Sequence, residues 1–262
     1  MLNKAKILKK YKLNCSDGEI GKVKDFYFDD QTWIIRYLVV NTGNWLIGRQ
    51  VLVSPHSIVS VNKEEESINI NLTKSQIENS PILDSEKPVS KQFQKEFNEY
   101  FEYPMSFGMI GYGGVGMTIP YNLAKTGKEK TTEKNEDENR GDPHLRSTHF
   151  VRGYGIQSLD DEIGHVEDFV MDVETWEIHY LQIDTKKWLP GRKVLISSKW
   201  IDRVSWTDSI VFVNLSSDEI EKSPEYTNDT ILDRGFETEL HKHYNRTAYW
   251  LDKQEVKDNT IK

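Results

Sequence analysis

The sequence predicts a mainly β protein with accessory helices, an α+β fold built from two small antiparallel β-barrels related by internal duplication. Three observations lead to this prediction. The chain repeats itself at an offset of 143 residues. Each repeat contains short β-branched and aromatic runs separated by turn-forming residues. A capped short helix and then a helix with an aromatic stripe follow each set of runs.

The duplication is visible residue by residue. Residues 18–81 match residues 161–224 without a gap at 28 of 64 positions, about 44%. An offset of this length is too long for a solenoid repeat, so it predicts two homologous domains. We expect the first barrel with its trailing helix at 1–104, a Gly-rich and then charged linker at 105–147, the second barrel with its helix at 148–250, and a C-terminal tail at 251–262.

The strands of the first copy can be read in order. The runs typical of strands span 23–28, 33–40, 50–53, 58–61 and 67–72, and a further strand is expected within 6–14. Turn formers recur every 8–12 residues or so, which is typical of a small antiparallel barrel or sandwich. The run at 33–40 is apolar on both faces, so both faces must be covered. We expect one face to fill the barrel and the other to lie under the following helices or the second copy.

Two kinds of helix follow the strands in each copy. Thr73–Gln76 and Ser216–Glu219 match the capping-box pattern that opens a helix. Residues 90–103 place Phe93, Phe97, Tyr100 and Phe101 at helical spacing, and the second copy repeats the stripe with Phe236, Leu240, His243 and Tyr244. Such a stripe is typical of a packing face. We expect it to close the barrel or to join the two copies.

Several segments resemble the PRC-barrel family. They are EIGKVKDF at 19–26, IRYLVV at 35–40 and WLIGRQVLVSP at 45–55, with EIGHVEDF at 162–169, IHYL at 178–181 and WLPGRKVLIS at 188–197 in the second copy. The family includes barrels of the photosynthetic reaction-centre H subunit and of a ribosome-maturation factor. The resemblance implies a binding or scaffolding fold and no shared reaction. The duplication further predicts a pseudo-twofold, intramolecular pseudo-dimer; higher oligomers stay open.

Composition narrows the class of protein. Residues 148–262 carry 14 basic and 22 acidic side chains, which accounts for the whole net charge of −8 and argues against a broad nucleic-acid surface there. No apolar run reaches the roughly 18–20 residues of a spanning helix, and no signal peptide is visible. These observations predict no membrane insertion and a cytoplasmic location. The one cysteine, Cys15, excludes an internal disulfide framework.

No group of residues predicts catalysis, a metal site or a cofactor. Gly111–Gly116 matches a dinucleotide-binding pattern, but Pro120 interrupts the helix that such a site needs. His241 and His243 lie two residues apart with no cysteine nearby, which does not suit zinc. We therefore expect a non-enzymatic binding or scaffold protein with a protein partner. The alternatives are an RNA- or ribosome-associated module and an enzyme with a site between the copies.

Three residue pairs are candidate contacts to a partner or an anion: Arg49 and Arg192, Trp45 and Trp188, Asp25 and Asp168. For the arginines and aspartates, we favour an internal ion pair or a turn contact over a shared contact to an anion or a partner. The tryptophans fit either a core position or an exposed platform, and we expect them to be buried. Each buried indole would hide about 150–250 Å², worth roughly 4–6 kcal/mol.

Overall fold

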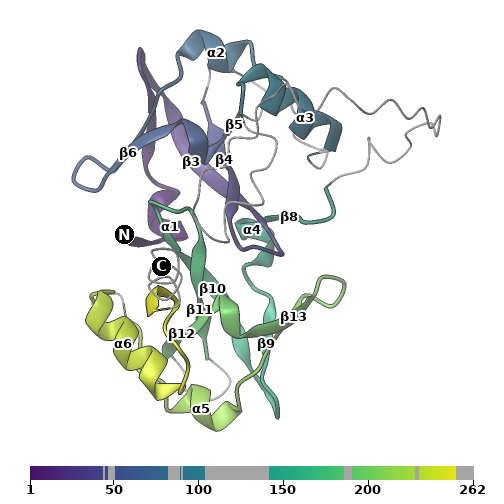
Figure 1. The fold of residues 1–262 in the computed structure, drawn as a ribbon, viewed down its shortest axis with the longest axis vertical. Coiled ribbons are helices and arrows are strands. Elements are labelled where there is room, and N and C mark those ends of the chain that lie inside the picture. Colours follow the sequence, from purple (N-terminus) through teal and green to yellow (C-terminus); the bar gives the residue numbers. More distant parts are fainter. Residues whose placement is uncertain are drawn as a thin grey trace, which may run out of the picture.

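The computed structural model describes residues 1–43, 45–46, 51–81, 89, 91–103, 142–185, 191–227 and 230–251. The Gly-rich and charged stretch up to residue 141 and the tail after residue 251 lie outside these residues. The described chain forms two seven-stranded sheets, one centred on each copy, and Figure 1 shows the first copy above the second. The predicted fold class, mostly β with a few helices in two related units, is confirmed.

The first sheet has the strand order β5-β4-β3-β2-β7-β6. Neighbouring strands are antiparallel except β2 and β7, which are parallel. The elements are β2 (Lys12–Cys15), β3 (Gly18–Asp29), β4 (Ile35–Asn41), β5 (Val51–Val53), the 3₁₀ turn η1 (Pro55–Ser57), β6 (Ile58–Asn62), β7 (Ser67–Ile70), α2 (Lys74–Glu78) and α3 (Lys91–Tyr100).

The second sheet repeats this order as β12-β11-β10-β9-β14-β13. Its elements are β9 (Gly155–Gln157), β10 (Glu162–Asp172), β11 (Ile178–Asp184), β12 (Lys193–Ser197), η4 (Ser198–Trp200), β13 (Ile201–Ser205), β14 (Ile210–Val213), α5 (Ser217–Glu221) and α6 (Arg234–His243). The predicted capping boxes are present, because the Thr73 and Ser216 side chains each accept the backbone N–H three residues on. The duplication therefore extends to the trailing helices, since α3 and α6 begin and end 143 residues apart.

The two copies exchange their first strands. Strand β1 (Leu2–Lys4) pairs with β10 of the second copy, and β8 (Leu145–Ser147) pairs with β3 of the first. A one-turn helix follows each exchanged strand, α1 (Ala5–Leu8) and α4 (Thr148–Val151). The sequence placed β8 inside the linker and a strand at 6–14. The structure has the strand β8 within the predicted linker. Within 6–14 it has the end of the helical turn α1 and then the start of β2.

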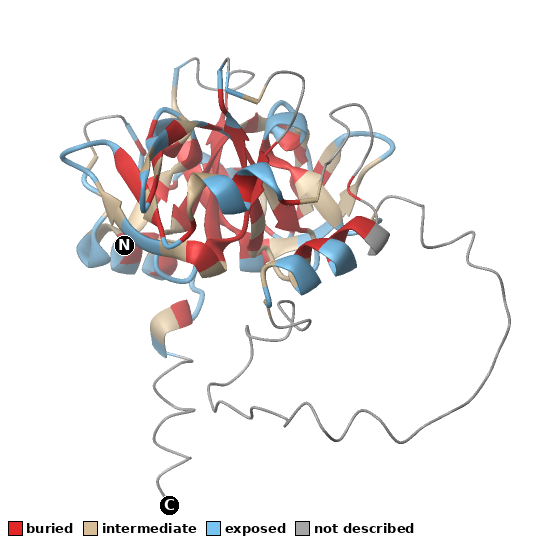
Figure 2. Ribbon diagram, turned by 90° about the horizontal axis from the view of Figure 1, so that it is seen from above, coloured by how far each residue is buried: buried red, intermediate tan, exposed pale blue. Residues whose placement is uncertain are grey.

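The buried core is continuous across the two copies. The Phe26 ring lies 6.3 Å from that of Trp176, and the Phe28 ring lies 6.0 Å from that of Phe169. Figure 2 shows buried residues through the middle of the molecule and exposed ones on the loops and outer helix surfaces. Since the apolar faces of both sheets meet here, the copies form one folded unit.

Each trailing helix covers the outer face of its own sheet. Tyr37 and Val39 of β4 form a small buried cluster with Phe93 and Phe97 of α3. The Tyr37 and Phe97 rings meet edge to face at 5.3 Å. The helices that follow the strands therefore cover the second apolar face of the 33–40 run, as one of the two expected arrangements.

A glycine repeated in both copies allows β3 and β10 to approach the next strand closely. A Cβ atom on Gly21 would lie 2.1 Å from the backbone oxygen of Asn41, and one on Gly164 would lie 2.0 Å from that of Asp184. Gly21 also has a φ of +146°, which L side chains rarely adopt. The Glu-Ile-Gly segment shared by the copies is therefore required by backbone packing.

Candidate functional site

The hairpin tips of the two copies hold each other through reciprocal backbone hydrogen bonds. The Ile35 N–H donates to the Trp176 carbonyl at 2.8 Å, and the Ile178 N–H donates to the Trp33 carbonyl at 2.8 Å. Both tryptophans have positive φ angles, +59° for Trp33 and +57° for Trp176. This conformation is unfavourable for a bulky side chain, so the surrounding structure must impose it. The contact between the copies is thus pseudo-twofold, as the duplication predicts.

Asp25 joins the copies through the first turn of α4. It is buried and accepts hydrogen bonds from the hydroxyl groups of Ser147 and Thr148, the latter at 2.7 Å. The Lys9 ammonium of the first copy lies 2.8 Å from the same carboxylate. The internal ion pair considered for this position exists. The hydrogen bonds from Ser147 and Thr148 extend it to the other copy.

Asp168 occupies the equivalent position with different donors. Its carboxylate accepts the backbone N–H of Lys6 at 3.1 Å and that of Phe169 at 2.9 Å. Burial raises the pKa of this carboxyl, while the two hydrogen bonds and the charges of Lys9 and Lys4 oppose the rise. Both predicted aspartates therefore fasten the exchanged turns, and their carboxylates are turned to the interior.

The predicted arginines and tryptophans divide differently. Arg192 donates to the Ser223 carbonyl at 2.5 Å, an internal turn contact. Arg49 and Trp188 lie outside the described residues. The expectation that Trp45 is buried is wrong, because 36% of its side chain is exposed. It lies in the turn after β4, where its neighbour Leu46 packs against the core instead.

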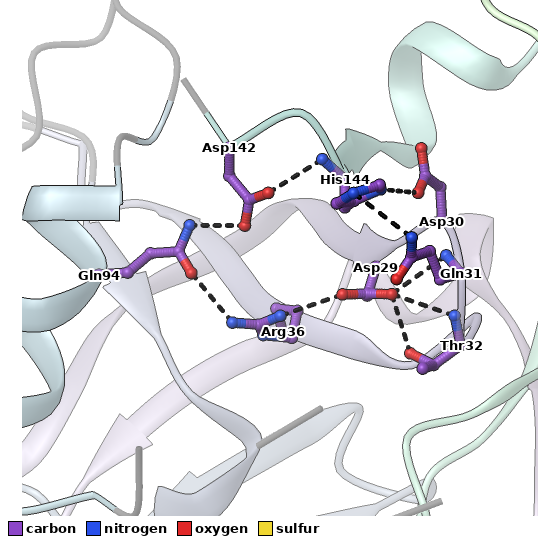
Figure 3. Close-up of polar contacts among 8 residues, drawn as sticks. All are labelled: Asp29, Asp30, Gln31, Thr32, Arg36, Gln94, Asp142 and His144. Carbon is purple, nitrogen blue, oxygen red and sulfur yellow. Dashed lines mark hydrogen bonds and ion pairs between the residues drawn. The ribbon is translucent and has the colours of Figure 1, made fainter. Parts of the chain in front are cut away.

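A polar network ties α3 to the β3–β4 hairpin in the first copy (Figure 3). Asp29 accepts the backbone N–H and the hydroxyl group of Thr32, at 3.0 and 3.1 Å. The Arg36 guanidinium lies 3.1 Å from the Asp29 carboxylate and donates to the Gln94 side-chain oxygen at 3.0 Å. The Gln94 amide in turn donates to Asp142 at 2.7 Å. These contacts link the hairpin, the helix and the segment that leads into β8.

The same segment is held at a second point. The His144 ring lies 3.0 Å from the Asp30 carboxylate, and Arg146 forms an ion pair with Asp30 at 3.0 Å. Tyr103, at the end of the first copy, and Leu145 both pack against the cluster under α3. The described residues up to 103 and those from 142 onward are therefore both bound to the first copy.

The second copy has a buried aromatic and ionic cluster at the corresponding place. One oxygen of Glu237 accepts the hydroxyl groups of Tyr180 and Tyr249, each at 2.9 Å. The Arg234 guanidinium lies 3.1 Å from the other oxygen. The Tyr180 hydroxyl also lies 3.0 Å from Nε2 of His241. These contacts fasten α6 and the segment after it to β11.

Burial governs the ionisation of this cluster. It lowers the pKa of His241 and raises the pKa values of Tyr180 and Tyr249. The Tyr249 ring also stacks on His179 at 4.1 Å. Sequence reasoning considered His241 only as a zinc ligand and missed this cluster, because its members come from β11, α6 and the segment beyond α6.

The described residues do not provide a metal centre or a membrane span. They contain no group of three or more His, Cys, Asp or Glu side chains placed to hold a metal ion. Among the same residues, no helix combines the length and the apolar character needed to cross a membrane. The polar side chains described above bind mainly to one another.

One pair of exposed apolar residues occupies equivalent positions. Ile7 on α1 is 45% exposed, and Phe150 on α4 is 73% exposed. Exposed basic or imidazole side chains flank both: Lys6 and Lys10 beside Ile7, His149 and Arg152 beside Phe150. Figure 1 shows α1 and α4 beside the contact between the copies.

Comparison with known families supports two matching domains. A family model described as PRC-barrel domain matches residues 13–77 and 151–220. The first match runs from β2 into α2, and the second runs from the end of α4 into α5. No curated protein matches the chain.

Proposed function

Because this chain belongs to the PRC-barrel domain family and carries the domain twice, we propose that it is a non-enzymatic binding or scaffold protein of the cytoplasm. Its docking face is formed by the two exchanged turns, α1 and α4. The observation that carries the proposal is the pair of exposed apolar residues, Ile7 and Phe150, at the same position in both copies.

The symmetry of this pair is what gives it weight. A single exposed apolar residue is ordinary on a protein surface. Here the reciprocal strand exchange places α1 and α4 in equivalent surroundings, so Ile7 and Phe150 project from related positions on either side of the pseudo-twofold axis. The flanking Lys6, Lys10 and Arg152 suit a protein partner with an apolar patch bordered by acidic groups.

The engagement of the polar groups supports binding over catalysis. Asp25 and Asp168 hold the exchanged turns, and Arg36 is shared between Asp29 and Gln94. A general acid or base must lie within hydrogen-bonding distance of the substrate atom that gains or loses the proton. Each of these groups is held by other residues of the protein, so their arrangement favours a structural role.

Site-directed crosslinking in native lysate tests the proposal. A photoreactive phenylalanine analogue replaces Phe150 in the full-length protein, and a second preparation carries it in place of Leu159. Leu159 is a matched control, because it is 68% exposed in the same copy but lies outside the exchanged turns. We expect a protein adduct from position 150 only, and we expect Ile7→Ser to weaken it.

Two results would overturn the proposal. Equal adducts from positions 150 and 159 would show that the exchanged turns have no special role. Adducts that consist of RNA and disappear on ribonuclease treatment would favour the RNA-associated alternative. Thermal unfolding of Ile7→Ser should match that of the parent protein, which separates lost binding from lost folding.

A further inference from the structure

Three facing positions of the α6–β11 cluster differ in chemistry from their counterparts in the first copy. Arg36, Gln94 and Asn98 of the first copy correspond to His179, Glu237 and His241 of the second. The protonation state of the arginine and of the two amides in the first copy does not change between about pH 5 and 8, whereas histidine gains or loses a proton in this range. The same structural position is therefore insensitive to protons in one copy and sensitive in the other.

His241 is enclosed by rings. Only 4% of the residue is exposed. Its ring centroid lies 5.1 Å from that of Trp200 and 5.3 Å from that of Trp250. Nε2 lies 3.0 Å from the Tyr180 hydroxyl. Because the Tyr180 hydroxyl donates its hydrogen bond to Glu237, the Nε2–H group of His241 donates to the Tyr180 oxygen.

The segment that covers His241 rests on the same cluster. Tyr249 is held by its hydrogen bond to Glu237 and by stacking on His179. Trp250 lies under the Arg234 guanidinium at 4.0 Å. A positive charge on His241 would be buried away from water and close to Arg234, which disfavours the closed arrangement.

We propose that this cluster is a proton-operated latch: protonation of His241 releases Tyr249 and Trp250 from the outer face of the second copy. Their counterparts in the first copy, Gln94 and Asn98, are an amide at each position of Glu237 and His241 and do not titrate over the same pH range. The latch stands independently of the partner-binding proposal, because it rests on a different part of the molecule.

Proton linkage determines whether acid favours the closed or the released form. Burial holds the pKa of His241 below its ordinary value of 6.5 in the closed form, and the ring regains that value once released. As the pH falls through about 6.5, the released form binds a proton first, so acid favours release and neutral pH favours closure.

Neighbouring charges both favour and oppose the protonation of His241. The ionisable groups facing His241 and the covering segment are Tyr180 and His179 on β11, Glu177 just before it, Lys199 on η4, Arg234 and Glu237 on α6, and Tyr249. Glu237 favours the imidazolium, but its carboxylate is already matched by Arg234. Burial, Lys199 and Arg234 lower the pKa of His241, while the backbone of Thr247 and Arg246 raises it by hydrogen bonding, and the lowering prevails.

Fluorine NMR of the full-length protein, labelled with 5-fluorotryptophan, tests the latch. The Trp250→Phe variant identifies the Trp250 resonance. Between about pH 8 and 5, we expect this resonance to move to a solvent-exposed position with a midpoint below 6.5. The resonance of Trp176, buried between the copies, should stay unchanged. His241→Asn, which installs the residue of the first copy, should abolish the transition.

Each other outcome overturns the latch. A Trp250 resonance that does not move down to about pH 5, or a transition that persists in His241→Asn, removes His241 as the trigger. A Trp176 resonance that changes with the same midpoint shows global unfolding instead of release. If His241→Asn fails to fold, Glu237→Gln provides the second test. Loss of its carboxylate should move the release midpoint to higher pH, and a shift to lower pH contradicts the proposal.

Discussion

The two copies share a backbone but fasten their exchanged turns with different side chains. In the first copy Asp25 holds hydroxyl groups and an ammonium group, and in the second Asp168 holds backbone N–H groups. The acceptor is repeated while its donors have changed. An aspartate at this position therefore requires a hydrogen-bond donor in the exchanged turn, but side-chain and backbone donors both serve. The residue types in that turn can differ between the copies for this reason.

The trailing helices show the same contrast on a larger scale. In the first copy, Gln94 of α3 binds Asp142, which lies in the segment before β8. In the second copy, Glu237 of α6 binds Tyr249 of the segment that follows the helix. Each helix thus anchors whatever chain comes next. The two copies have kept the position of this anchor while changing its chemistry from neutral to ionisable.

The shared glycines should be the most sensitive positions in both copies. In Gly21→Ala and Gly164→Ala, the new methyl group would lie about 2 Å from a backbone oxygen of the next strand. A backbone oxygen in a sheet cannot move aside as the end of a flexible side chain can. We expect losses of about 3–5 kcal/mol or failure to fold, measured by urea unfolding. The Gly21 variant should lose more, because its φ angle is also unfavourable.

Gly155→Ala is the matched control for these variants. A Cβ atom there would meet its nearest neighbour, a side-chain carbon of Ile210, at 3.9 Å, an ordinary contact. We expect a change below about 1 kcal/mol. If the control destabilises as much as Gly164→Ala, the close approach of the strands is not the cause.

Asp25→Ala and Thr148→Val should separate the contribution of the carboxylate from that of one of its hydroxyl donors. It leaves the hydroxyl groups of Ser147 and Thr148 and the Lys9 ammonium without their shared acceptor at a buried site. We expect a loss of about 2–4 kcal/mol in unfolding free energy. Thr148→Val removes one donor and should cost less. Equal costs for the two variants would mean that the carboxylate contributes through this one hydroxyl alone.

The sequence predicts what repeats and what local patterns encode. The duplication, the β-rich units and the capping boxes follow from residue identities at a fixed offset, and the Asp25 and Asp168 pair is visible in the same alignment. The strand exchange is not predictable in this way. Leu2–Lys4 and Leu145–Ser147 are three-residue strands whose partners lie in the other copy, and no local pattern identifies such a partner.

Trp45 illustrates a second limit. An indole repeated at the same position in two copies suggests a core residue, yet a turn can place it beside the core with its neighbour inserted instead. Burial depends here on the direction of one side chain in an irregular segment, which neither periodicity nor composition determines. The clusters around Gln94 and Glu237 were missed for a related reason, since tertiary packing brings their members together.

Trp45→Ala should therefore have a modest effect. Because more than a third of the indole is exposed, we expect a loss near 1 kcal/mol in urea unfolding. Trp176→Ala is the contrasting variant, because Trp176 is 5% exposed and lies in the core shared by the copies. We expect it to cost about 3–5 kcal/mol. Similar losses for both variants would mean that Trp45 is buried in solution.

Asp168→Asn should have the smallest effect at neutral pH and the most informative pH dependence. The pKa of this carboxyl is raised, chiefly by burial, so the folded state binds a proton more readily than the unfolded state does. The stability of the parent protein therefore gains as the pH falls toward the unfolded value of 3.8. Asparagine keeps an oxygen for the N–H groups of Lys6 and Phe169 but does not titrate.

We accordingly expect Asp168→Asn to be at least as stable as the parent at pH 7, with its advantage shrinking in acid. Urea unfolding at several pH values measures the difference between the two proteins. A variant that is clearly less stable at pH 7 would show that the attraction of Lys4 and Lys9 for the carboxylate outweighs the cost of its burial. Asp168 would then act as Asp25 does, through charge, and the contrast between the two copies would reduce to the identity of the donors.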